Sequence, residues 1–142
     1  MVGLREVFER LRARLVAFRD DSGRELYDVP GAPLPDPEAP APPRFLPEFD
    51  NALLSHADRA RIVSEEHRRA LSKDSLMRGV LLDGFVSGTW KTERTGGKAT
   101  LLIEPFEPLV KKVRNSLIKE GERLVRFVGK DAEAVKVRYV EP

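Results

Sequence analysis

The 142-residue sequence has no cysteine and no glutamine, and it contains a single tryptophan and two methionines. Without cysteine the chain has no disulfide framework, no thiolate nucleophile and no cysteine-ligated metal site. No Gly-rich phosphate loop is present, and we expect no cofactor. No apolar run approaches the roughly 20 residues that a membrane-spanning helix needs. The N-terminus also lacks the continuous apolar segment of a secretory signal. These absences favour a cytoplasmic, soluble protein with no membrane partner.

Charge of neither sign dominates the sequence. Charged residues make up 34% of the chain, yet 25 Lys and Arg are offset by 23 Asp and Glu, which leaves a formal net charge of +2. The sequence pI is about 9.0. This mildly basic balance is weaker than that of a strong nucleic-acid binder. The hydrophobic fraction of 41% is sufficient for a real core.

The N-terminal third divides into a helix, a short strand and a connector. Apolar residues recur at helical spacing over residues 3–19, which predicts an amphipathic helix with an arginine-rich remaining surface. Residues 25–29 read as a short strand. Seven of the 11 prolines fall within residues 30–43 and predict a stiff, polyproline-like connector; a PxxP ligand segment is the alternative. We therefore expect 1–29 as helix and strand, 30–43 as connector and 44–142 as an α+β domain, all in one folding unit.

Two hairpins that share a central strand organise residues 76–106. Asp83-Gly84 and Gly96-Gly97 are the turn pairs, because such residues tolerate the positive φ of a type I′ turn. Tight turns fix the register: Leu82 opposite Phe85, Leu81 opposite Val86, Gly79 opposite Gly88 and Met77 opposite Trp90 across the first, Thr92 opposite Leu101 and Trp90 opposite Ile103 across the second. One face then carries Met77, Leu81, Val86, Trp90, Leu101 and Ile103. The other face is mostly polar, so one buried and one wet face are predicted.

A long helix and a last strand complete the predicted fold. Residues 107–128 have an apolar stripe at helical spacing that includes Gly121, which allows close packing on the sheet or marks a kink. Gly129-Lys130-Asp131 ends the helix, and Val135, Val137 and Tyr139 alternate with charged residues as a final strand. The predicted fold class is α+β: an antiparallel sheet of about four or five strands packed against this C-terminal helix, with the N-terminal amphipathic helix beside it.

The segment 44–71 carries most of the remaining polar candidates. Residues 45–49 read as a strand in which Pro47 indicates an edge or bulge. Asp50 or Asn51 is a good helix N-cap, Ser55 or His56 could start another short helix, and residues 64–71 read as a charged helical turn. His56 with Asp58 is conceivable as a general-base pair of a hydrolase, but no serine nucleophile motif accompanies it. His56 and His67 lack further ligands at metal-binding spacing.

The segment 44–63 and the first hairpin together resemble a known family. The residues concerned are Phe45-Leu46-Pro47-Glu48-Phe49-Asp50-Asn51, Leu53-Leu54, Asp58-Arg59 and Arg61, then Gly79-Val80-Leu81-Leu82-Asp83-Gly84 and Val86-Ser87-Gly88-Thr89-Trp90. They are similar to the C-terminal part of the bacterial winged-helix DNA-binding-domain proteins, a group that includes glycosylases acting on alkylated and crosslinked bases. The resemblance extends from residue 4 to about residue 128 and implies an actinobacterial DNA-repair setting. The Gln-x-Gln motif of the glycosylase branch has no counterpart, because the chain contains no glutamine. We therefore expect a C-terminal fragment or a short reading frame.

These observations lead to two open hypotheses for function. The first is a non-catalytic DNA-binding accessory module that holds phosphates through Lys91, Arg94, Lys98 and Arg78. On this hypothesis the chain alone is not an enzyme, although a longer parent protein could be a DNA glycosylase. The second is a structural or interaction module, such as a homodimerisation domain; Glu93, Glu104 and Glu107 favour it if they break up the basic patch. Asp50, Asn51, Asp58 and Arg59 match the family pattern, and we expect them to form a buried polar network that holds the loop to the sheet; a DNA-contacting role is the alternative.

Overall fold

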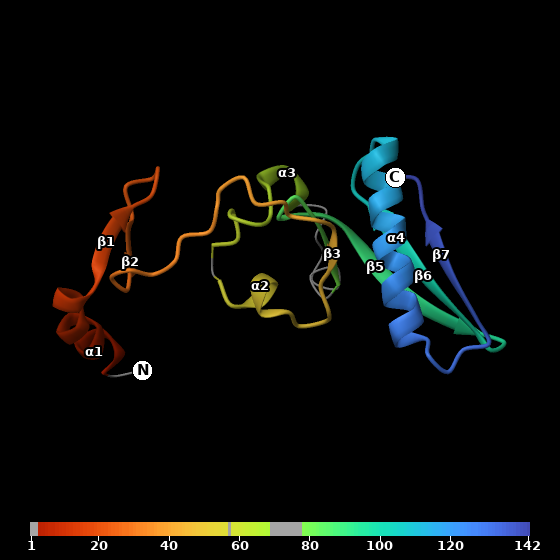
Figure 1. Ribbon diagram of the computed structural model, residues 1–142, viewed down its shortest axis with the longest axis horizontal. Helices are drawn as coiled ribbons and strands as arrows, with labels where there is room; N and C mark the ends of the chain where they lie inside the picture. The colour runs from red at the N-terminus through yellow and green to blue at the C-terminus, as the bar shows by residue number, and fades with distance from the viewer. Residues whose placement is uncertain (1–2, 57, 69–77) are drawn as a thin grey trace. The chain divides into compact units, whose positions relative to one another are not determined.

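The computed structural model describes residues 3–56, 58–68 and 78–142, and it divides into two compact units, Met1–Ala39 and Pro40–Pro142. The fold class is α+β, as predicted (Figure 1). The chain forms α1 (Leu4–Leu11), the 3-10 helix η1 (Arg12–Arg14), β1 (Val16–Arg19), β2 (Glu25–Asp28), β3 (Arg44–Phe45), α2 (Asn51–Leu54), α3 (Glu65–Arg68), β4 (Gly79–Leu82), β5 (Phe85–Thr95), β6 (Lys98–Pro105), α4 (Lys111–Val128) and β7 (Ala134–Tyr139). Among the described residues, no helix is long and apolar enough to cross a membrane.

The first unit corrects the predicted helix over residues 3–19. The helix ends at Leu11, and Val16–Arg19 instead forms β1, which pairs antiparallel with β2. The turn between them is held by Asp20, whose Oδ1 accepts the backbone N–H of Ser22 and of Arg24 at 2.9 Å each. The backbone and side-chain hydrogen bonds from Arg24 lower the pKa of the Asp20 carboxyl below its ordinary value. The predicted short strand is confirmed as β2.

The second unit is a five-stranded sheet of order β3-β4-β5-β6-β7 (Figure 1). The first four strands are antiparallel, as predicted, whereas β7 lies parallel to β6 because α4 carries the chain back across one face of the sheet. The strand predicted at residues 45–49 is confined to the short edge strand β3, and the helix predicted over 107–128 begins at Lys111. The helix turn expected at Ser55 or His56 does not form; α3 is the next helix.

The core lies between α4 and the sheet. Leu101, Ile103 and Leu117 are fully buried there. Gly121 allows close packing, one of the two alternatives for this residue: a Cβ at this position would lie 2.9 Å from Cδ2 of Leu101. The cluster also contains Val80, Ala99 and Val125.

Both hairpin turns form as predicted, with positive φ at Asp83, Gly84, Gly96 and Gly97. The register is confirmed for Leu82 opposite Phe85, Leu81 opposite Val86, Thr92 opposite Leu101 and Trp90 opposite Ile103.

Beyond Leu81 the predicted register is wrong by one residue. Val80 lies opposite Gly88 and Gly79 opposite Thr89, so Ser87 is an extra residue in β5, that is, a β-bulge. The predicted pair Gly79 and Gly88 therefore does not form. Trp90 donates its backbone N–H to the carbonyl of Arg78, and the predicted partner Met77 lies outside the described residues.

The bulge also overturns the prediction of one wet face. Regular alternation would put Val86 and Trp90 of β5 on one face, as predicted, but the extra residue between them puts them on opposite faces: Trp90 packs against the α4 core, while Val86 is buried in a second cluster with Leu53 and Val63. Leu46, Ile62, Leu81 and Phe106 pack around that second cluster. The loop that contains α2 and α3 thus covers the end of the sheet that the sequence pattern assigns to solvent.

Candidate nucleic-acid interface

The β5–β6 hairpin has two chemically different faces. Leu101 and Ile103 lie against α4, as the distances from Gly121 show. Directly opposed residues share a face, so Lys91, which pairs with Leu102, lies on the other side of the sheet, here called the outer face. The outer face of β5, β6 and β7 carries Lys91, Glu93, Thr95, Lys98, Thr100, Leu102, Glu104, Lys136 and Arg138.

The structure brings only two of the four predicted DNA-binding residues together on this outer face. Lys91 and Lys98 both lie there, and the Nζ of Lys91 is 3.2 Å from Oε1 of Glu104. No acidic group lies within ion-pair distance of Lys98 among residues 3–56, 58–68 and 78–142. Arg94 lies on the α4 side, where its guanidinium donates a 2.6 Å hydrogen bond to the carbonyl of Val128 at the C-terminus of α4.

Arg78, the fourth predicted cation, lies apart from the hairpin tip. It forms an ion pair with Glu48 and stacks over the ring of Trp90 at 5.7 Å from the ring centroid. Its charge is thus shared between a carboxylate and an aromatic face.

The tip of the hairpin is anchored rather than free. The backbone N–H of Glu133, in the loop that joins α4 to β7, donates to the carbonyl of Gly97 at 2.8 Å. A hollow of about 290 Å³ lies beside this contact and is lined by Arg94, Thr95, Gly96, Gly97, Lys98, Asp131 and Ala132. The charged residues around this hollow are therefore two cations, Arg94 and Lys98, and one acid, Asp131.

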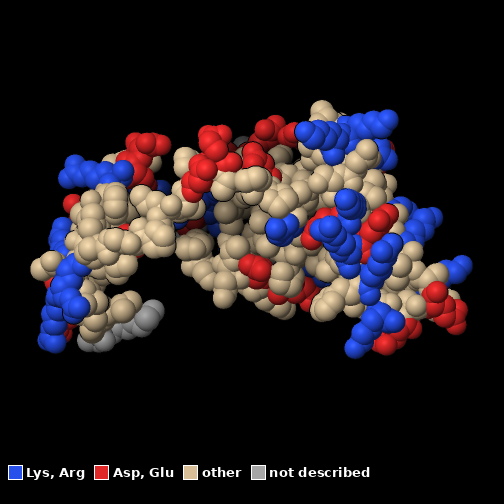
Figure 2. Space-filling model, in the orientation of Figure 1, with Lys and Arg blue, Asp and Glu red and all other residues tan. Residues whose placement is uncertain are grey.

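Sequence reasoning missed the cations that β7 and α4 bring to this unit. Lys136 lies in register with Thr100 and Arg138 with Leu102, so both join Lys98 on the outer face. The alternation of charged and apolar residues in β7 was visible in the sequence, but its parallel pairing with β6 was not. Figure 2 shows basic side chains, with acidic ones among them, over the part of the surface where Figure 1 draws α4. The basic residues of α4 are Lys111, Lys112, Arg114, Lys119, Arg123 and Arg126.

The residues predicted to form a polar network lie in two local turns, one at the start of α2 and one after it. Asp50 is the N-cap of α2, and its Oδ1 accepts the backbone N–H of Ala52 at 2.8 Å. Asn51 is the first residue of that helix. The Oδ1 of Asp58 accepts the N–H of Ala60 at 2.9 Å. The carbonyl of Arg59 accepts from Ile62 and Val63, which closes the following turn.

The two histidines do not share a site. His56 is exposed, whereas His67 is part-buried between the carbonyl of Val86, 3.1 Å from Nδ1, and Oε1 of Glu107, 2.9 Å from Nε2. Hence His67 ties α3 to β5 and to the segment before α4. Within the described part of the chain, no three His, Asp or Glu side chains gather in a way that could hold a metal ion.

Comparisons with known proteins give one family and one fold. A family model described as "DNA glycosylase AlkZ-like" matches residues 1–127. Among solved structures, the chain is similar to Streptomyces sahachiroi DNA glycosylase AlkZ, with 24% sequence identity and a TM-score of 0.63. That similarity covers 96% of this chain and 36% of the other, and at this identity it shows a shared fold alone. The search of curated proteins found no match.

Proposed function

The chain belongs to the AlkZ-like DNA glycosylase family, and from this premise we propose that it is a DNA-contacting module of a DNA-repair protein without catalysis of its own. The chain spans only 36% of the length of the solved relative, so the activity in that protein's name is not transferred to this chain. The resemblance of residues 44–90 to winged-helix DNA-binding-domain proteins supports the same proposal. The observation that carries it is the anchored basic tip of the β5–β6 hairpin.

The tip suits contact with a phosphate backbone. Lys98 has no acidic partner among the described residues, and Arg94 keeps its charge while one guanidinium nitrogen donates to Val128. Both residues border the hollow at the tip. Because the backbone N–H of Glu133 donates to the carbonyl of Gly97, the backbone of the turn that carries these two residues is tied to the segment after α4. Phosphate contacts of this kind position a protein on DNA and carry no sequence information.

Lys91 contributes less than the sequence alone indicates. Its ion pair with Glu104 already neutralises much of its charge. We therefore count two phosphates rather than three, which predicts a slope of log affinity against log salt concentration of about −1.8. Binding is expected to be weak, with a dissociation constant on the order of 10⁻⁵ M, and indifferent to sequence.

The absence of catalysis is proposed from the chemistry of the residues. The glutamines of the Gln-x-Gln motif have no equivalent in a chain without glutamine. His56 is exposed, and Oδ1 of the nearby Asp58 is engaged by a backbone N–H. The test is incubation of the full 142-residue chain with a duplex that carries a methylated base. Release of that base, abolished by a point substitution in the chain, would show that the chain is itself an enzyme.

The DNA contact is tested by fluorescence anisotropy with a labelled duplex of about 20 base pairs at several salt concentrations. The test variant is Lys91→Ala, Arg94→Gln, Lys98→Ala, in which glutamine retains an N–H donor for Val128. The control variant, Lys111→Ala, Lys112→Ala, Lys119→Ala, removes the same charge from α4. The test variant should lose most of the affinity and flatten the salt slope, while the control keeps both. If the α4 variant loses binding instead, the interface lies on α4.

A second candidate function is an interaction module, and α1 supplies the observation that favours it. Leu4, Val7 and Leu11 of this helix are 65%, 52% and 41% exposed. Exposed apolar side chains in one helix are typical of a surface that binds another protein. Analytical ultracentrifugation of the parent and of a Val7→Glu variant distinguishes the two candidates. Self-association that Val7→Glu abolishes, together with no DNA binding at low salt, would favour the interaction module.

A further inference from the structure

Among the strands of the described residues, β7 is the last of the sheet and pairs with β6 alone, so its other side has no strand partner there. The backbone N–H of Val140 donates to Ile103, and backbone groups alternate in direction along a strand. Lys136 and Arg138 therefore point their backbone groups toward β6, whereas Val135 and Val137 point theirs to the open edge. A row of free donors and acceptors of this kind is a template for one more strand.

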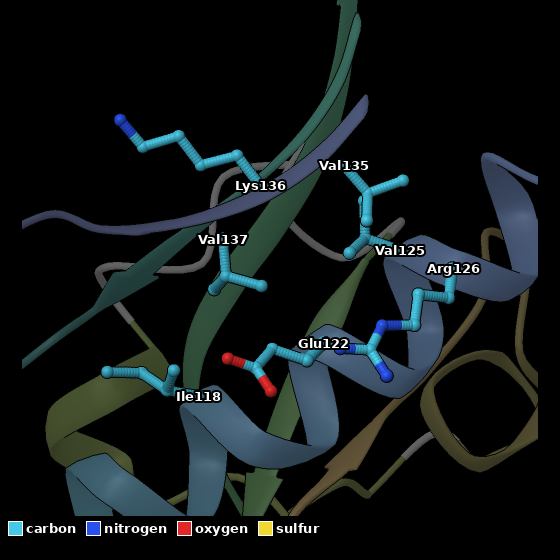
Figure 3. Close-up of a pocket in the computed structure, with 7 residues that line it drawn as sticks. All are labelled: Ile118, Glu122, Val125, Arg126, Val135, Lys136 and Val137. Carbon is cyan, nitrogen blue, oxygen red and sulfur yellow. The ribbon is translucent and has the colours of Figure 1, made fainter. Parts of the chain in front are cut away.

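A groove runs beside this edge, between β7 and α4. It has a volume of about 270 Å³, and its apolar lining comes from Ile118 and Val125 of α4 and from Val135 and Val137 of β7. Figure 3 shows Glu122 and Arg126 on the α4 side of the groove and Lys136 on the opposite side of β7 from Val137. Val135 is 37% exposed at the mouth of the groove. A strand added to β7 would place every second side chain in this groove.

The other side chains of an added strand would lie on the outer face, beside Lys136 and Arg138. Opposite charges across neighbouring strands stabilise the pairing and like charges destabilise it. A twofold pairing of β7 with a second copy, centred on Lys136, Val137 or Arg138, sets cation directly against cation. A strand with acidic residues at alternate positions meets the same cations as partners. The charges of β7 thus disfavour a second copy and favour an acidic strand.

We propose that the β7 edge and its groove form a binding site for an extended peptide in which acidic and apolar residues alternate. The peptide adds a strand to the sheet, places its apolar side chains between Val135, Val137 and α4, and pairs its carboxylates with Lys136 and Arg138. This proposal does not depend on DNA binding, because the hairpin cations Lys91 and Lys98 take no part in it.

The test uses the full chain and a short fluorescein-labelled peptide of alternating valine and glutamate. Fluorescence anisotropy should show binding of this peptide, but not of a valine–lysine peptide or of a valine–glutamate peptide interrupted by proline. Amide shifts in ¹⁵N-¹H spectra should be largest at Val135, Val137 and Tyr139. The variant Lys136→Glu, Arg138→Glu should bind the acidic peptide about tenfold more weakly, since two cross-strand charge pairs change sign.

Two further variants show whether the peptide binds at the β7 edge or elsewhere on the chain. Val135→Pro removes an outward-facing N–H without touching the ladder to β6, so it should abolish peptide binding while circular dichroism shows an intact fold. Lys91→Ala, Lys98→Ala should keep the parent affinity for the peptide whatever it does to DNA binding. The proposal is overturned if the acidic peptide does not bind, if acidic and basic peptides bind alike, or if Val135→Pro leaves binding unchanged. A dimer that Val135→Pro dissociates would show that a second copy occupies the edge, and would overturn it too.

Discussion

Trp90 is the residue whose truncation best tests how the second unit is held together. It lies on the α4 side of β5, opposite Ile103, and packs against the core. Its ring meets that of Phe45 edge to face, with centroids 5.9 Å apart. Its indole Nε1–H donates a 2.8 Å hydrogen bond to the carbonyl of Leu46. One side chain thus joins the β3 segment to the hairpin and to the core beneath α4.

The free energy lost on truncation follows from these contacts. Replacing a buried tryptophan by alanine costs about 3–5 kcal/mol. Trp90 is only half-buried, which lowers this figure, but the hydrogen bond to Leu46 adds about 1 kcal/mol. We expect Trp90→Ala to lower the free energy of unfolding by about 3 kcal/mol, a large share of the roughly 5–15 kcal/mol typical of a domain. Trp90→Phe keeps a ring in place and should cost about 1 kcal/mol.

The assay is thermal and urea unfolding followed by far-UV circular dichroism, because Trp90 is the only tryptophan and fluorescence would vanish with it. For a domain of about 100 residues, 1 kcal/mol shifts the melting temperature by roughly 4–8 °C. Trp90→Ala should therefore melt more than about 10 °C below the parent. A double-mutant cycle with Phe45→Leu should show a coupling of about 1 kcal/mol. Melting of Trp90→Ala within a degree or two of the parent would refute the packing described.

Two further predictions concern single contacts in the same unit. A Cβ at Gly88 would lie 2.8 Å from the Cα of Pro105, a backbone atom of the neighbouring strand, so Gly88→Ala should cost about 1–3 kcal/mol in urea unfolding. Gly121→Ala is its control, since the added methyl meets a leucine side-chain end and gains about 1 kcal/mol of helix propensity; equal losses at both sites would contradict this reasoning. Asp50→Ala should cost about 1 kcal/mol by removing the cap on the N–H of Ala52, and Asp50→Asn should restore it. If asparagine behaves like alanine, the cap contributes nothing.

The sequence predicted the hairpins well near their turns and poorly away from them. Asp83-Gly84 and Gly96-Gly97 dictate tight turns, and the residues beside each turn pair as these turns require. The bulge at Ser87 has no comparable signal, because nothing in that residue type distinguishes a bulged position from an ordinary one. Its cause is tertiary: two apolar clusters on opposite sides of the sheet both take residues from β4 and β5.

The N-terminal segment shows a different limit of sequence reasoning. Phe18 continues the apolar spacing of α1, so the pattern alone extends the helix to residue 19. In the structure Val16–Arg19 is instead the strand β1, which forms a hairpin with β2, and Asp20 closes the turn between the two strands. Asp20 followed by Gly23 suits a turn between two short strands as well as it suits the end of a helix. Helical and extended pairing compete over so short a segment, and periodicity does not decide between them.

The candidate site shows why cations counted along a sequence overstate a basic patch. The predicted register of β5 and β6 already puts Lys91 and Glu104 on one face, but only the structure shows that their side chains form an ion pair. The contact between Arg94 and Val128 depends on where α4 ends relative to the hairpin, which no local pattern indicates. Lys136 and Arg138 join the outer face only because α4 returns the chain parallel to β6. Folding therefore removes some charges from the patch that the sequence predicts and adds others.

The parallel crossover also explains how one small sheet offers two different surfaces. Had β7 paired antiparallel through a tight turn, α4 would not lie across the sheet and no groove would border the edge. With α4 in place, the odd-numbered residues of β7 face the groove and the even-numbered ones face outward with Lys98. A substitution at Val135 should consequently change peptide binding alone, and one at Lys98 should change DNA binding alone. This separation is expected even though Ala134, next to Val135 in β7, pairs with Lys98. The two proposals are thus tested by residues that share one sheet but not one face.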